Sequence, residues 1–292
     1  MRRRHVFRTI CSCFFAILPI LAAASGASAQ GSRAATAASY IERGRLWLTK
    51  GDLERADKDF NLAVVSDPGS ADAYYNRGLV RYFRKEYDAA FSDFNQAIAL
   101  NPRLAEAWSN RGAIRCVRSD LEGAIRDATK AIELKPTLIL AWSNRGIALR
   151  DKGELDGAIA DFDQAIKLES KPAAIYMHRG AAFYLKGDLS RATADFTSAV
   201  KYDPLLAEAW CDRGVARHAG DDLDGALADY EQAIKLKPQL AKAWLNRGLA
   251  RLERGNKEGA ENDFAEALKL KPELKNIVEQ MIQRTIAITP NE

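Results

Sequence analysis

Residues 207–240 read AEAWCDRGVARHAGDDLDGALADYEQAIKLKPQL, and these 34 residues contain the pattern from which the fold can be predicted. The dipeptide Arg213-Gly214 inside it is one of seven Arg-Gly pairs that follow one another at intervals of 34 residues. Their glycines are Gly44, Gly78, Gly112, Gly146, Gly180, Gly214 and Gly248. A fixed period of this length predicts tandem copies of one supersecondary unit, which stack on one another to bury a shared core.

Small and large side chains alternate at fixed positions of the repeat. With Ala37 as position 1 of the first copy, every copy has an aromatic residue at position 4, Gly at 8 and Ala at 20 and 27. Position 24 is Phe or Tyr except at Ala128, and a proline closes each copy at position 32, or two residues later at Pro172. The small residues allow two helices to approach closely, and the rings fill the remaining space. The proline ends the second helix.

The turns inside the copies carry their own signals. Gly51, Gly153, Gly187 and Gly255 can adopt the left-handed conformation that ends a first helix. Four aspartates are placed to cap the second helix that follows: Asp52, Asp120, Asp188 and Asp222. Each copy therefore reads as helix, short turn, helix.

The pattern resembles the tetratricopeptide repeat over residues 37–274, with matches at positions 4, 8, 20, 24, 27 and 32. The resemblance implies an all-α, right-handed α-solenoid of seven helix-turn-helix repeats at 37–70, 71–104, 105–138, 139–172, 173–206, 207–240 and 241–274. Beyond them, residues 275–292 are expected to form a capping helix and a C-terminal tail, because apolar residues at Ile277, Val278, Met281 and Ile282 lie on one helical face.

The N-terminus reads as a signal peptide. Residues 1–29 combine a cationic start with an apolar run from Ile10 to Ala24 and the small residues Ala27, Ser28 and Ala29. The run of 15 residues is shorter than the roughly 20 needed to cross a bilayer. We expect cleavage after Ala29, a mature chain without a membrane span, and export, to the periplasm in a bacterium. Residues 30–36 are expected to be a flexible lead-in.

Charge argues against a nucleic-acid partner. The chain has 43 basic and 39 acidic residues, and four of the basic ones lie in the leader, so the remaining chain is formally neutral. Within the repeats, however, Arg stands at position 7 and Asp at position 23 in all seven copies. We predict buried ion pairs, for example Arg111 with Asp127 or with Asp93, since partly buried charges need partners. The competing hypothesis is a row of arginines that binds anions.

The resemblance also implies where a partner binds. Family members hold an extended peptide or a partner's helix on the concave face formed by the first helices, here positions 2, 5, 6, 9, 12 and 13. Asparagine recurs at position 6, where it is either a clamp for a peptide backbone or solvated family background. The candidate groove residues are Tyr75, Asn76, Leu79, Tyr82, Phe83, Asn110, Asn144, Arg150, Met177, His178, Tyr184, Asp212, Leu245 and Asn246.

The function predicted from the sequence is therefore a non-enzymatic scaffold that binds a protein or peptide partner, with no cofactor, metal or catalytic residue. Two alternatives stay open. One is a structural component of an envelope complex that binds through its convex face, formed by the second helices. The other is a metal or thiol enzyme using His178, Cys211 and His218, although no ligand-spacing motif supports it.

Overall fold

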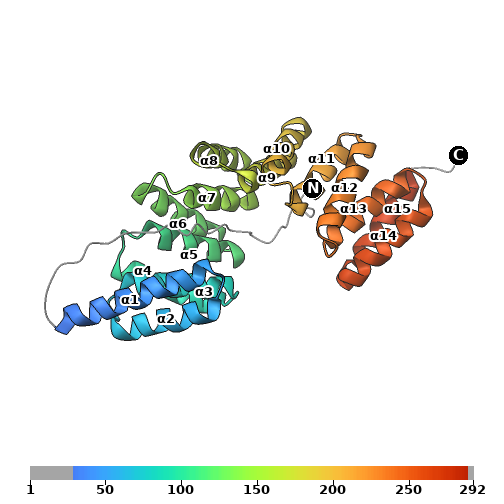
Figure 1. Cartoon of the computed structure of the whole chain (residues 1–292). Coiled ribbons are helices and arrows are strands. Elements are labelled where there is room, and N and C mark those ends of the chain that lie inside the picture. The colour runs from blue at the N-terminus through green and yellow to red at the C-terminus, as the bar shows by residue number, and fades with distance from the viewer. Residues whose placement is uncertain (1–28, 289–292) are drawn as a thin grey trace. The chain divides into compact units, whose positions relative to one another are not determined.

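The computed structural model describes residues 29–288, which form fifteen α-helices, one 3₁₀-helix and no strand (Figure 1). The fold class is an all-α solenoid of helix pairs, as expected. The described residues fall into two compact units, 29–157 and 158–288, and the division lies inside one helix. The expected signal peptide lies outside the described residues.

The unit of residues 29–157 is built from helix pairs. Within each pair the first helix packs along the second (Figure 1). The bounds are α1 (Ala29–Thr49), α2 (Leu53–Ser66), α3 (Ala71–Phe83), α4 (Tyr87–Leu100), α5 (Ala105–Val117), α6 (Leu121–Leu134) and α7 (Ile139–Lys152). Helix α8 (Leu155–Leu168) begins in this unit and continues into the next.

The unit of residues 158–288 repeats the same arrangement. After α8 it contains α9 (Ala173–Lys186), α10 (Leu189–Tyr202), α11 (Ala207–Ala219), α12 (Leu223–Leu236), α13 (Ala241–Glu253) and α14 (Lys257–Leu270). A 3₁₀ turn, η1 (Pro272–Leu274), leads into α15 (Lys275–Ile288). Val278 of α15 is buried, and Ile282 packs against a cluster that contains Phe264 and Leu249. Helix α15 thus covers apolar surface of the last repeat.

The segment expected to be a flexible lead-in is helical. Helix α1 starts at Ala29 and includes all of residues 30–36, so this expectation is corrected. The physical reason is composition: Ala34, Ala35 and Ala37 have the highest intrinsic helix propensity, and the helix they extend is held by the packing of its later turns. None of the described helices is long and apolar enough to cross a membrane.

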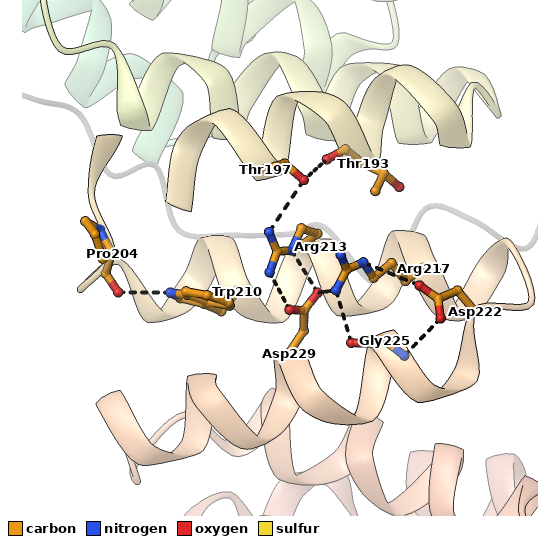
Figure 2. Close-up of polar contacts among 9 residues, drawn as sticks. All are labelled: Thr193, Thr197, Pro204, Trp210, Arg213, Arg217, Asp222, Gly225 and Asp229. Atoms are coloured by element: carbon orange, nitrogen blue, oxygen red, sulfur yellow. Dashed lines mark hydrogen bonds and ion pairs between the residues drawn. The ribbon is translucent and has the colours of Figure 1, made fainter. Parts of the chain in front are cut away.

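The core follows the predicted alternation of small and large residues. The alanines at positions 20 and 27 are at most 1% exposed, and the rings of Phe60, Phe94, Phe162, Phe196 and Tyr230 are fully buried. Proline at position 32 has a second role beyond ending the helix. Its carbonyl accepts a hydrogen bond from the indole Nε1 of the next repeat's Trp, for example from Trp210 to Pro204 at 2.9 Å (Figure 2).

The turns bear out the capping prediction. The carboxylates of Asp52, Asp120, Asp188 and Asp222 each accept a hydrogen bond from the backbone N–H three residues later. Gly51, Gly153, Gly187 and Gly255 have positive φ. The other three repeats place Lys85, Ser119 and Asp221 in the same left-handed conformation, with φ of 62–65°.

Lys85 offers a test of that conformation. We expect Lys85→Gly to raise the free energy of unfolding by about 1 kcal/mol, because glycine has no Cβ to clash in the left-handed region. Urea denaturation followed by circular dichroism measures the change. The matched control is Gly153→Ala, at φ of 95°, which should destabilise the protein. A loss of stability in Lys85→Gly would contradict the explanation.

Candidate partner-binding surface

The arginine at position 7 ties three helices together, as Figure 2 shows for Arg213 of α11. Its Nε and Nη2 donate to the two carboxylate oxygens of Asp229 on α12, at 2.9 and 2.6 Å. Its Nη1 donates to Thr197 Oγ1 on α10 at 3.5 Å, and its guanidinium lies 4.6 Å from the ring centre of Trp210. Arg217, one turn later, also donates to Asp229 at 3.0 Å. The residue Asp229 as a whole is 1% exposed.

The same bidentate ion pair recurs along the chain. The pairs are Arg43–Asp59, Arg77–Asp93, Arg111–Asp127, Arg179–Asp195, Arg213–Asp229 and Arg247–Asp263. The predicted ion pairing is confirmed, and the partner of Arg111 is Asp127 in its own repeat. Two further groups bond to these ion pairs and were not predicted from the sequence. One is a second arginine, at position 11 in four repeats, which contacts the same aspartate, and the other is an acceptor at position 25 of the preceding repeat, which bonds to the position 7 arginine. Recurrence of Arg at position 11 was the available signal.

The asparagines of position 6 are used between repeats. Asn110 Nδ2 donates to the hydroxyl of Tyr75 at 3.3 Å, and Asn144 Nδ2 donates to the backbone and side-chain oxygens of Ser109, both at 3.1 Å. Asn76 donates to the carbonyl of Asp72 in its own helix. These three asparagines are 2–3% exposed. The amides of Asn110 and Asn144 therefore join neighbouring first helices, and the Oδ1 of Asn76 accepts a hydrogen bond from Arg45 Nε on α1 at 3.3 Å. These asparagines are buried and not solvated, which corrects the background alternative.

The last two repeats replace this ladder with other chemistry. Asp212 stands at position 6 of α11 and forms a 2.9 Å ion pair with Lys242 on α13. Asn246, the position 6 residue of α13, lies 3.9 Å from the Cys211 sulfur through its Nδ2. Lys242 keeps part of its side chain, 29%, open to solvent. At position 6, the first helices of residues 158–288 therefore include a charged carboxylate, at Asp212, where those of residues 71–157 carry asparagine amides.

The structure places every candidate groove residue on a first helix. Most of them are buried in packing between helices: Asn76, Leu79, Tyr82, Asn110, Asn144, Arg150, Met177, His178, Tyr184, Asp212 and Leu245. Tyr75 and Asn246 are half-buried, and Phe83 is 39% exposed. Next to them are open groups that the sequence did not single out, among them Glu253, whose carboxylate contacts His218 Nε2 at 2.7 Å.

The thiol or metal enzyme finds no support in this geometry. Cys211 is completely buried, and burial raises the pKa of its thiol to about 12, so the nucleophilic thiolate is scarce at neutral pH. His178 stacks on Phe162, and His218 contacts Glu253. Within residues 29–288 no group of three His, Cys, Asp or Glu side chains is arranged to hold a metal ion.

Comparison with known proteins agrees with the repeat pattern. Models of the family described as "Tetratricopeptide repeat" match residues 71–104 and 241–274, and one described as "TPR repeat" matches 146–187 and 216–255. No curated protein sequence matches the chain.

Three similar solved structures show the fold. A tetratricopeptide repeat protein from Parabacteroides merdae is 18% identical, with 86% of this chain and 99% of that one covered and a TM-score of 0.65. PilW, a type IV pilus biogenesis factor, is 20% identical, with 71% and 96% covered and a TM-score of 0.65. YrrB, described as having an unusual peptide-binding site, is 21% identical, with 65% and 96% covered and a TM-score of 0.50.

Proposed function

This chain is a tetratricopeptide repeat protein, a class of protein–protein interaction scaffold, and we propose that it binds a peptide segment or a partner protein on the face of its first helices. In this proposal no covalent bond is made or broken on that face. The protein works outside the cytoplasm, because residues 1–29 have the pattern of a signal peptide. A peptide-binding site is what YrrB is described as having, and the same mode is proposed for this chain.

One observation carries the proposal: most of the residues that the repeats share are buried, whereas the residues at the ends of the first helices vary. Position 24 rings, position 20 alanines and the Arg–Asp pairs hold the helices together. Positions 12 and 13, at the ends of the first helices, differ in almost every repeat. Position 12 is Leu48, Tyr82, Cys116, Arg150, Tyr184, His218 and Leu252, and position 13 is Thr49, Phe83, Val117, Asp151, Leu185, Ala219 and Glu253. Stacking alone requires no such variety.

The open groups give each unit its own binding chemistry. In residues 29–157 the exposed ring of Phe83 lies at the end of α3, and the half-buried Tyr75 lies two turns before it. Aromatic side chains of this kind anchor partners by burying large apolar area. In residues 158–288 the partly exposed groups are the Lys242 ammonium, paired with Asp212, and the contacting side chains of His218 and Glu253, which favour a partner with polar or charged side chains.

Site-specific crosslinking tests which helices contact the partner. A photoreactive residue is placed at Phe83 or Glu253 on first helices, and at Ser92 or Lys269 on the second helices of the same two repeats, where both side chains are exposed. We expect a partner from envelope extract to be labelled from Phe83 or Glu253. Phe83→Ser should then weaken recovery of the same partner by about tenfold, because an exposed aromatic anchor is lost.

The second-helix positions distinguish the alternative. Labelling confined to Ser92 and Lys269 would show that the second helices make the contact and would support the structural envelope component instead. Circular dichroism of each variant verifies that the helical fold is kept, so that a lost crosslink reports on contact.

A further inference from the structure

The first repeat exposes a surface that every later repeat buries. Position 10 of the first helix is 50% exposed at Leu46, but at most 1% exposed at the six equivalent residues Val80, Ile114, Ala148, Ala182, Ala216 and Ala250. The side chain of Arg43 at position 7 is 54% exposed, against 9–20% for Arg77, Arg111, Arg179, Arg213 and Arg247. Arg43 and Leu46 lie on one side of α1, and Lys50 follows at the helix end, four residues after Leu46 and directly after Thr49, the last residue of α1.

In the later repeats this side is covered by the second helix of the preceding repeat. The position 7 arginine donates through Nη1 to position 25 of that helix, as in Arg77 to Asn61 at 3.0 Å and Arg111 to Asn95 at 2.8 Å. The equivalent acceptors of Arg145, Arg179 and Arg213 are Thr129, Asp163 and Thr197. Arg43 retains its pair with Asp59, but the described residues contain no helix ahead of α1 to offer such an acceptor.

Two further contacts complete the repeated interface. Val80 at position 10 shares a cluster with Val64, at position 28 of the preceding helix. The basic residue at position 14 pairs with an acid at position 18 of that helix, as in Lys152 with Glu122 at 2.7 Å, and likewise Arg118 with Asp88 and Arg254 with Asp224. Lys50 is position 14 of the first repeat and has no such helix before it among the described residues.

The second helices of the chain therefore show which residues a helix needs in order to pack against this surface. Helix α4 carries it as Asp88, Phe91, Asn95 and Ile98, and α6 as Glu122, Ile125, Thr129 and Ile132. We propose that the exposed surface formed by Arg43 and Leu46 of α1 and by Lys50, directly after α1, is a docking site for a helix of another protein with this pattern. The pattern begins with an acidic residue, as at Asp88. Relative to that residue, an apolar residue follows at +3, a side-chain hydrogen-bond acceptor at +7 and Ile or Val at +10. This site is separate from the first-helix face proposed above.

A second copy of the chain fits the surface poorly. Pairing α1 with its own copy would bring two sets of Arg43 and Lys50 into one contact, and like charges repel. The final second helix, α14, has Glu261 and Ala265 at positions 21 and 25, where the pattern needs an apolar residue and an acceptor. Its Leu268 already packs in the cluster that includes Ile282 of α15. A partner helix is left as the occupant.

The test uses a designed helical peptide as the probe. It is alanine-based, about 18 residues long so that it is helical in water, and carries Asp, Phe, Asn and Ile at the spacing of α4. Fluorescence anisotropy of the labelled peptide with the full chain should show saturable binding. Leu46→Glu should weaken it by about tenfold or more, since a buried leucine is replaced by a charge. Leu205→Glu, at a leucine 76% exposed elsewhere, is the matched control and should change nothing.

Charge reversal makes the assignment specific. Lys50→Glu should weaken binding of the Asp peptide, and a peptide with Lys in place of that Asp should recover affinity for Lys50→Glu alone. Absence of binding up to about 1 mM peptide, the range of the weakest specific contacts, overturns the proposal. So does equal binding to the wild type and to Leu46→Glu. Analytical ultracentrifugation that shows a dimer dissolved by Leu46→Glu would assign the surface to a second copy instead.

Discussion

Replacing Asp229 with alanine is expected to lower the free energy of unfolding by about 3–5 kcal/mol, because it leaves a buried arginine without its counter-ion. Asp229 is 1% exposed and accepts from both Arg213 and Arg217. The Arg213 side chain is only 9% exposed, so water cannot take over the lost contacts. Urea denaturation followed by circular dichroism measures the change.

Asp59→Ala is the matched control at the same repeat position. The side chain of its partner Arg43 is 54% exposed and can be hydrated when the carboxylate is removed, so the loss of stability should be much smaller than at Asp229. Equal losses at Asp229 and Asp59 would show that burial of the arginine does not set the cost. If Asp229→Ala has the same free energy of unfolding as the wild type, the hypothesis that the position 7 arginines bind anions would be favoured instead.

The second large effect is expected at Gly214. A Cβ added there would lie 2.6 Å from Cε1 of Tyr230 and 3.2 Å from the carbonyl oxygen of Ala226, so the two helices of the repeat would have to separate. We expect Gly214→Ala to cost about 1–3 kcal/mol, although alanine is the better helix former. The midpoint of thermal unfolding, read by circular dichroism, reports the loss.

The third repeat supplies the control for Gly214. Its position 24 residue is Ala128 instead of a ring, and a Cβ at Gly112 would meet nothing closer than 3.3 Å. The gain in helix propensity, about 1 kcal/mol, should offset the mild crowding there and leave Gly112→Ala close to the wild type. If both substitutions destabilise the protein equally, the ring at position 24 is not what requires the glycine.

Much of the fold could be read from the sequence because it depends on local chemistry repeated at a fixed interval. Gly214 opposite Tyr230, Asp222 at the start of α12 and Pro204 after α10 each act within one helix pair or one turn. The pairing of Arg213 with Asp229 was also foreseeable, since seven matched opposite charges on adjacent helices need one another. The helical start of α1 does not follow from the sequence, because small and polar residues such as those at 30–36 are equally typical of a linker.

The candidate site was less accessible to sequence reasoning. Asn110 and Asn144 occupy positions that face a partner in the family, yet their amides bond to Tyr75 and Ser109 on the neighbouring first helix. The distance between successive first helices decides whether a side chain at this position bonds to the neighbouring helix or stays available to a ligand. A change smaller than the length of one hydrogen bond is enough to alter the outcome. The repeat period alone does not specify that distance.

The sequence alone predicts the helical repeat, its register and the residues that hold each helix pair together, because these follow from side-chain size and charge at fixed spacing. The tertiary structure is needed to show which polar groups form hydrogen bonds between repeats and which stay exposed to solvent. In the structure Asn144 is buried, whereas Phe83 and Leu46 are exposed. Exposure is set by which helix lies alongside, and at the first repeat no described helix precedes α1.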